Sequence, residues 1–215
     1  MYDNLEDHVS HSHQEPHFDS PDTSSFEKQV EGLKQTLLSK GLITQVELEE
    51  MIAELDQRTP FDGAQIIARA WTERDFRNRL IANGTKAVSE LGYHPPDDFQ
   101  SLVVLANTEF LHHLIVCTLC SCYPRWLLGR PPDWYKSIAY RSRAVSDPRG
   151  ILNEFGVTLD PNISIRVVDS TAEVRYMVLP LRPSGTDNLN MKELVGLITR
   201  DSLIGVGLPH SPSVG

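Results

Sequence analysis

The sequence lacks any apolar run close to the roughly 20 residues that a helix needs to span a bilayer. It also lacks a basic stripe, since 20 Lys and Arg stand against 29 Asp and Glu in 215 residues, a net charge of −9. Binding to a phosphate backbone therefore has no electrostatic basis. The first 18 residues show neither the basic start nor the apolar stretch of a secretion signal. We expect a cytoplasmic protein that binds neither a membrane nor nucleic acid.

Cysteine is scarce as well, with three in the chain. An odd count excludes a framework in which every cysteine is paired, and it agrees with a reducing compartment. Cys117, Cys120 and Cys122 fall within six consecutive residues, where a disulfide would close only a trivial loop. Metal or redox chemistry is the better interpretation of this segment, which we call the cysteine loop (117–122).

Residues 1–25 contain no Lys or Arg, but they hold six acidic residues and four of the eight histidines. This composition is typical of a disordered or partner-draped arm. The histidines (His8, His11, His13 and His17) can capture a divalent ion. A solubilising role is the simpler interpretation, and we assign them no site.

Residues 26–210 are expected to form a single domain whose first part, to about residue 92, is helical. Thr44 and Glu47 have the spacing of a capping box at the start of the second helix. Apolar spacing predicts helices from Phe26 to a stop at Gly41, and at 46–55, 64–71, 76–82 and 85–91.

The second part, from about residue 100 to 210, has β character. Strands are expected at 101–106, 114–117, 163–168, 175–179 and 203–206, and helices at 149–155 and 191–199. Asp147 and Pro148 supply an N-cap and a first helical residue. This order indicates an α+β fold, with a helical N-terminal half followed by a mixed β/α layered region that carries the cysteine loop, rather than a doubly wound sheet.

The cysteine spacing suits a compact chelate. Cys120 and Cys122 flank Ser121, so two sulfurs and the backbone nitrogens of Ser121 and Cys122 can surround one ion in a plane. Cys117 can supply an axial sulfur and leave the opposite position open. This donor set favours low-spin Co(III) or Fe(III) over zinc, which prefers a tetrahedron of side chains. Spacing alone leaves structural zinc, an iron–sulfur fragment and unliganded cysteines open.

Several runs carry a resemblance to a known family. ValCysThrLeuCysSerCysTyrPro (116–124), ProProAspTrpTyrLys (131–136) and ThrArgAspSerLeuIleGlyVal (199–206) resemble the α-type subunit of the nitrile hydratase family. The resemblance covers most of the chain from about Gly41 onward and leaves out the first 25 residues.

The resemblance implies a ligand set of three sulfurs (Cys117, Cys120 and Cys122) and two main-chain nitrogens (Ser121 and Cys122). It implies that Cys120 is oxidised to a sulfinic acid and Cys122 to a sulfenic acid, whose oxygens orient or activate water. Within this family, Thr118 with Tyr123 goes with cobalt. The implied cofactor is one non-corrin Co(III) per subunit, with iron(III) as the alternative.

The activity that the resemblance implies is hydration of a nitrile to an amide, with Cys122, Cys120 and Ser121 as the catalytic group. The implied partner is a β-type subunit in an obligate hetero-oligomer, and a metallochaperone is a further candidate. The competing hypothesis from another class is a non-catalytic module that binds or delivers a metal.

Departures from the family pattern bear on the substrate. Nitrile hydratases usually carry Trp directly after the proline of this motif, whereas here Arg125 precedes Trp126. Tyr-Pro-Arg instead resembles the γ subunit of thiocyanate hydrolase, a relative that yields carbonyl sulfide and ammonia; toyocamycin-type nitrile hydratases are a third alternative. A cation at Arg125 favours an anionic substrate such as thiocyanate, although a contact between subunits is an equal alternative for Arg125. Arg125, Trp126 and Glu90 are the candidate substrate-binding residues.

Further side chains lie near the cysteine loop in sequence. Arg141, Arg143 and Lys136 are candidates to stabilise oxidised cysteines or to form salt bridges between subunits. Trp134 and Tyr135 are expected to pack around the loop. His112 and His113 resemble zinc ligands by type, but core or interface roles are favoured.

Overall fold

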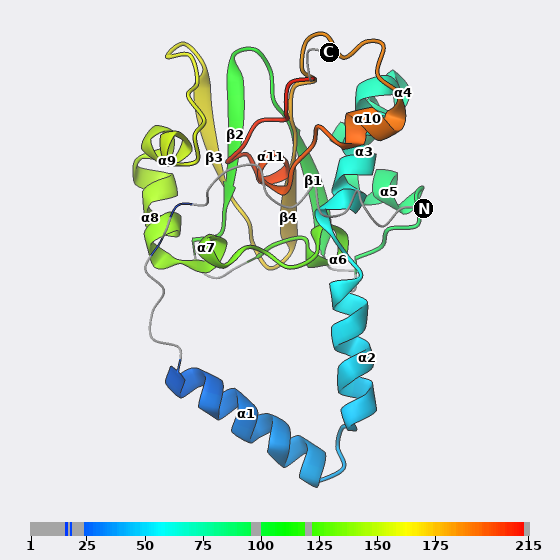
Figure 1. Ribbon diagram of the computed structural model, residues 1–215, viewed down its shortest axis with the longest axis vertical. Helices are drawn as coiled ribbons and strands as arrows, with labels where there is room; N and C mark the ends of the chain where they lie inside the picture. Colours follow the sequence, from blue (N-terminus) through cyan, green and yellow to red (C-terminus); the bar gives the residue numbers. More distant parts are fainter. Residues whose placement is uncertain (1–15, 17, 19–23, 96–99, 119–121, 213–215) are drawn as a thin grey trace.

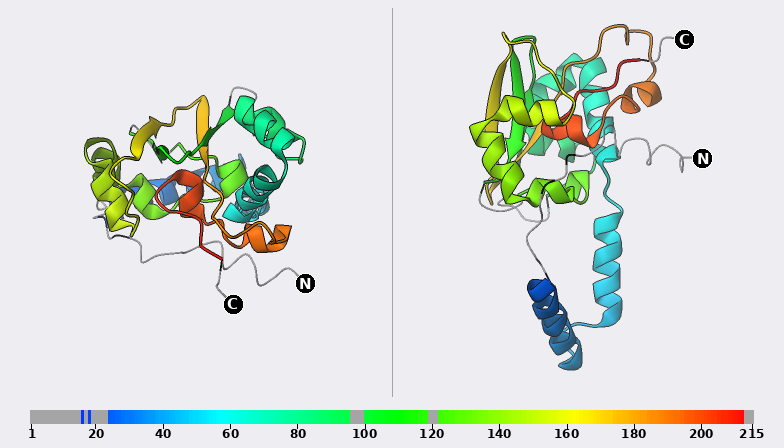
Figure 2. Two further views of the ribbon diagram at one scale, coloured as in Figure 1. Left: turned by 90° about the horizontal axis from the view of Figure 1, so that it is seen from above. Right: turned by 60° about the vertical axis from the view of Figure 1, so that its left-hand side comes forward.

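The computed structural model describes residues 16, 18, 24–95, 100–118 and 122–212. Its first two helices, α1 (Ser24–Ser39) and α2 (Gln45–Asp56), project from the body of the molecule as an arm (Figures 1 and 2). The capping box predicted at Thr44 and Glu47 is confirmed, because each donates to the other's side chain. The described residues leave the apolar stripe of α1 uncovered, and Phe26 and Leu33 are 67% and 59% exposed.

The body begins with three helices, α3 (Pro60–Thr72), α4 (Arg74–Ala82) and α5 (Gly84–Ser89). Helix α3 starts earlier than predicted, because the Thr59 hydroxyl accepts from the Phe61 N–H and Pro60 occupies the first helical position. Its inner face, which includes Ile66 and Ile67, is fully buried. An ion pair between described residues ties the arm to the body, with Arg130 Nε 2.6 Å from Asp56 Oδ1.

Two small parallel sheets follow. Strand β1 (Ser101–Ala106) pairs with β4 (Val174–Leu179), and β2 (Leu111–Val116) pairs with β3 (Ser164–Asp169). In the second sheet Val116 lies opposite Asp169. Because parallel strands share the edge where they end, the start of the cysteine loop meets the end of β3.

Short helices cover the region after the cysteine loop. They are α6 (Arg125–Leu128), α7 (Asp133–Lys136), α8 (Ile138–Ser146) and α9 (Pro148–Glu154). The Asp147 cap of α9 is confirmed, since its carboxylate accepts from the Gly150 N–H at 2.9 Å. Helices α6, α7 and α8 were not predicted, because the first two span four residues each, too few to establish a helical period.

The predicted strand at 203–206 is wrong. The chain forms α10 (Met191–Val195), shorter than the predicted helix, and then α11 (Arg200–Ile204), which Thr199 and Ser202 start with reciprocal hydrogen bonds. Gly205 ends α11 at φ 85°, where a Cβ would lie 1.9 Å from the His113 carbonyl oxygen. In the sequence, the apolar run at 203–206 resembles a buried strand. The caps at Thr199 and Gly205 make the segment a helix instead.

The described architecture confirms the α+β class, with helices around two small parallel sheets. Among the described residues no helix is long and apolar enough to cross a membrane.

Candidate metal centre

Strand β2 leads directly into the cysteine loop. Cys117 follows the buried end of the strand and is itself 1% exposed, whereas Cys122, at the other end of the loop, is half-buried. Cys120 and Ser121 lie outside the described residues, so their predicted ligand roles stay predictions. The structure therefore describes the two ends of the loop, at Cys117 and at Cys122.

Three hydrogen bonds, to two residues, hold Thr118. Its N–H donates to Asp169 Oδ1 at 2.9 Å, and its hydroxyl donates to Asp169 Oδ2. Its carbonyl oxygen accepts from Arg141 Nη1 at 3.2 Å. Since Asp169 is the last residue of β3, the β2–β3 register brings this carboxylate to the loop. The first turn after Cys117 thus has little freedom to shift.

Two buried tyrosines hold the flanks of the loop. The Tyr140 hydroxyl donates to the Ile115 carbonyl oxygen at 3.0 Å, two residues before Cys117. The Tyr135 hydroxyl donates to the Cys122 carbonyl oxygen at 3.1 Å. Burial raises the pKa of both phenols, and the neighbouring Tyr140 and Tyr123 raise that of Tyr135 further. Both hydroxyls therefore remain protonated donors.

The described donors suit a sulfur-rich site. The thiols of Cys117 and Cys122 stand at the two ends of a loop whose flanks are fixed by Tyr140 and Tyr135. Within the described ranges no three His, Cys, Asp or Glu side chains gather. Cys120, which the chelate requires, falls outside those ranges. The thiols of Cys117 and Cys122, at the two ends of the loop, are donors of the kind that the predicted ion binds.

His112 and His113 are not placed as metal ligands. Both are buried, and both contact Asn107. His112 Nε2 also lies 2.7 Å from the Gly205 carbonyl oxygen, so it joins β2 to the end of α11. Desolvation lowers the pKa of both rings, more than the Gly205 contact raises that of His112. The pair belongs to a buried polar network of the core.

The three candidate substrate-binding residues separate in the structure. Arg125 is exposed at the start of α6, and the half-buried Trp126 follows it, both within four residues of Cys122. Arg125 lines a cavity of about 530 Å³ with Arg130 and Lys136. Glu90 instead caps the end of α5 and pairs with Arg79 at 2.9 Å, which lowers the pKa of its carboxyl.

Of the three cations considered for the oxidised cysteines, Arg141 contacts the loop. Arg143 pairs with Glu154 at 2.5 Å, and Lys136 pairs with Asp133 at 3.3 Å. The pairs of Arg143 and Lys136 lie within this chain. The expected packing role of Trp134 and Tyr135 agrees with their burial.

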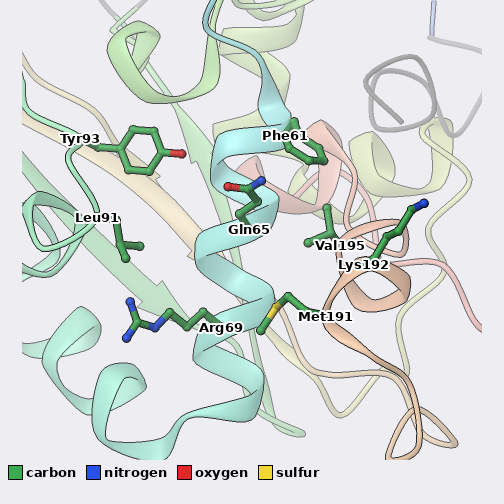
Figure 3. A pocket seen from close by; sticks show the side chains of 8 residues that line it. All are labelled: Phe61, Gln65, Arg69, Leu91, Tyr93, Met191, Lys192 and Val195. Atoms are coloured by element: carbon green, nitrogen blue, oxygen red, sulfur yellow. The ribbon is translucent and has the colours of Figure 1, made fainter. Parts of the chain in front are cut away.

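A second cavity lies along α3, away from the cysteine loop (Figure 3). Its volume is about 500 Å³ and its described lining contains no residue of the loop. Gln65 stands in its middle, the Arg69 side chain extends toward Leu91, and Lys192 points outward (Figure 3). Arg69 is already paired with Glu73 at 2.9 Å, so the cavity presents mainly apolar surface.

Asp169 is the residue of the site that sequence reasoning missed. No local sequence pattern connects it to Thr118, 51 residues away. The parallel pairing of β2 with β3 is the signal that would have found it. Predicting which strands pair requires long-range information that strand patterns do not carry.

Comparisons with known proteins identify relatives of this chain. The model of the family described as nitrile hydratase, alpha chain, matches residues 24–207. The low-molecular weight cobalt-containing nitrile hydratase subunit alpha of Rhodococcus rhodochrous is 49% identical over 86% of this chain and 89% of its own length. The thiocyanate hydrolase subunit gamma of Thiobacillus thioparus is 37% identical over 87% of this chain and 82% of its own length.

A solved structure shares the fold. A double mutant of the Fe-type nitrile hydratase from Comamonas testosteroni Ni1 superimposes with a TM-score of 0.82 at 40% identity, covering 89% of this chain and 94% of that chain. The site and the fold together define an alpha-type subunit with a cysteine loop. The chain belongs to the nitrile hydratase alpha-chain family.

Proposed function

We propose that this chain is the metal-binding catalytic subunit of a cobalt nitrile hydratase, which hydrates a nitrile to its amide. The observation that carries the proposal is the fixation of the cysteine loop at both ends, by Asp169 at Thr118 and by Tyr135 at Cys122. A loop held in this way keeps its donors in one geometry as substrate binds and leaves. The cobalt-containing relatives support the choice of metal.

The proposed ligands are the sulfurs of Cys117, Cys120 and Cys122 and the main-chain nitrogens of Ser121 and Cys122. A low-spin, non-corrin Co(III) bound there would supply a Lewis acid toward the carbon–nitrogen triple bond. We further propose that Cys120 is a sulfinic acid and Cys122 a sulfenic acid. Their oxygens would accept hydrogen bonds from water and orient it toward the substrate carbon.

The proposed partner is a β-type subunit, in an obligate hetero-oligomer in the cytoplasm. The exposed apolar stripe of α1 supports this assignment, because an arm that leaves Phe26, Val30 and Leu33 exposed is suited to a partner surface. Thr118 and Cys122 are also incompletely covered within this chain. A partner is therefore expected to cover these two residues.

Co-expression of the chain with its β-type subunit in cobalt medium tests the function. We expect stoichiometric cobalt by elemental analysis, a sulfur-to-metal charge-transfer band in the near ultraviolet, turnover of small nitriles, and intact mass increased by the sulfur-bound oxygens. Stoichiometric zinc without such a band would instead support the non-catalytic metal-binding module.

Replacing Asp169 with Asn tests the anchoring of Thr118. An amide cannot accept from both the N–H and the hydroxyl of Thr118 with the strength of a carboxylate. We expect cobalt affinity to fall about 10- to 100-fold, as for other groups that orient metal ligands. Because Asp169 is exposed, the unfolding free energy should fall by only about 1 kcal/mol.

Competition with a cobalt chelator and thermal unfolding measure these two effects. The matched control is Asp187→Asn, which makes the same chemical change at another exposed carboxylate. Equal cobalt retention in the Asp169 and Asp187 variants would remove Asp169 from the support of the site.

Thiocyanate is the second candidate substrate, and Arg125 is the observation that favours it. Its guanidinium shares a cavity with Lys136 and Arg130, whose charges are partly balanced by Asp133 and Asp56. We propose that Arg125 attracts an anionic substrate and that Trp126 packs against it. Glu90 is the weaker candidate, because its carboxylate is engaged by Arg79.

The substitution Arg125→Trp separates the two substrates. If thiocyanate is the substrate, removing the cation should lower kcat/KM for thiocyanate by about tenfold or more, since one lost charge contact is worth about 1.4 kcal/mol or more. The ratio of kcat/KM for a neutral nitrile to that for thiocyanate is the measurement. Lys192→Trp, on the α10 wall of the other cavity, controls for the lost charge. An unchanged ratio would exclude Arg125 from substrate selection.

A further inference from the structure

Phe18 is a buried side chain that precedes the arm. It is 9% exposed, although α1 begins only six residues later with an uncovered apolar stripe. The family match starts at residue 24, so Phe18 lies before it. Its ring contacts Tyr140 edge-on, with centroids 6.0 Å apart, and Phe155 at 6.3 Å. Phe18 therefore adds an aromatic contact from outside the matched range.

The rings around Phe18 form one aromatic cluster. Trp134 stacks edge-on against both Tyr140 and Phe155, with centroids 4.8 and 4.6 Å apart. Tyr135 lies 5.9 Å from Tyr140. Edge-to-face pairs of this kind stabilise a packed arrangement beyond the area that they bury. The aromatic cluster consists of Phe18, Tyr123, Trp134, Tyr135, Tyr140 and Phe155.

The aromatic cluster reaches the cysteine loop through two hydroxyl groups. Tyr140, which Phe18 contacts directly, donates to the Ile115 carbonyl oxygen before the loop. Tyr135, which contacts Tyr140, donates to the Cys122 carbonyl oxygen at the end of the loop. Tyr123, the residue after Cys122, packs on Tyr135 at 5.4 Å. Both flanks of the loop thus rest on rings that belong to one packed unit.

We propose that Phe18 is a positioning residue for the cysteine loop. Its ring packs against Tyr140 and Phe155 in the aromatic cluster. This packing restricts the movement of the tyrosines whose hydroxyls donate to Ile115 and Cys122. Phe18 is in this way tied to the candidate metal centre. Losing the Phe18 ring leaves Tyr140 and Phe155 without one packing partner, so the rings gain freedom and the loop flanks open more often.

The test uses the full chain in reduced form and compares Phe18→Ala with Phe110→Ala. Phe110 is 72% exposed in the turn between β1 and β2, so its truncation deletes the same atoms outside the aromatic cluster. Alkylation of Cys117 and Cys122, followed by site-resolved mass spectrometry, reports opening of the loop. Hydrogen exchange of the β1 amides reports opening of the core as a whole.

We expect Phe18→Ala to speed alkylation of Cys117 by about threefold to tenfold, the size of one aromatic pair contact. Exchange in β1 should rise by less than this factor, and Phe110→Ala should leave both rates at the wild-type values. Equal increases at Cys117 and in β1 would mean that Phe18 only stabilises the fold. That result, or an unchanged alkylation rate, would overturn the proposal.

The conservative variant Phe18→Leu keeps the measurement decisive if Phe18→Ala fails to fold. Leucine retains much of the apolar volume but loses the edge-to-face contact with Tyr140, so an intermediate alkylation rate is expected. A wild-type rate in this variant would again overturn the positioning role. The experiment requires neither metal nor turnover, so its outcome is independent of the proposed function.

Discussion

Replacing either Cys120 or Cys122 with Ser is expected to abolish cobalt retention and turnover together. A serine hydroxyl does not lose its proton at neutral pH, whereas a thiolate is an anionic donor of high affinity for soft and borderline metals. Each substitution would remove one sulfur ligand from the proposed chelate. Groups that only support metal ligands cost 10- to 100-fold when altered, so loss of a ligand should exceed about 100-fold.

Elemental analysis and turnover of the co-expressed complex measure this effect, with circular dichroism as the check on folding. The fold should survive, because the flanks of the cysteine loop remain bonded to Asp169, Tyr135 and Tyr140. Ser146→Ala, at the exposed end of α8, serves as a control for a small polar change nearby. Full cobalt occupancy in either cysteine variant would contradict the chelate.

Local signals in the sequence predicted most elements of the fold. The capping box at Thr44 and the Asp147 cap act over three residues, so their hydrogen bonds depend little on the rest of the chain. Strand β1 was predicted with its observed bounds, because its apolar and β-branched run is flanked by polar residues on both sides.

These local signals did not predict contacts between segments that are distant in the sequence. The pairing of β2 with β3, the burial of Phe18 and the contact of Tyr135 with Cys122 all depend on packing between distant segments. The same limit explains the wrong strand at 203–206, where a buried apolar run has the composition of a strand but helical caps. Tertiary packing decides such segments.

For the candidate site, the residue types and spacing of the cysteine loop predicted the chemistry, while the structure supplied its anchors. Hydrogen bonds with Asp169, Arg141 and Tyr135 hold the described part of the loop. None of these contacts is encoded by the loop itself. A metal site therefore needs both a chelating sequence and a distant frame that orients it.

The double substitution Val30→Asp and Leu33→Asp on α1 is expected to prevent assembly with the β-type subunit. Both side chains are exposed on the arm and share one stripe with Phe26. An obligate interface buries about 2,000 Å² or more and has an apolar centre. Two carboxylates placed there would lose their hydration without gaining partners, at a cost of several kcal/mol.

Size-exclusion chromatography and nitrile turnover after co-expression measure the effect. We expect the variant to elute as separate subunits. Its activity should fall below about one hundredth of the wild-type activity, because burying the two carboxylates lowers the association constant by more than about 100-fold. Lys28→Asp, on the opposite side of α1, introduces the same side chain outside the apolar stripe and should assemble normally. A double variant that elutes with its partner and turns over nitrile at the wild-type rate would show that the arm is not the interface.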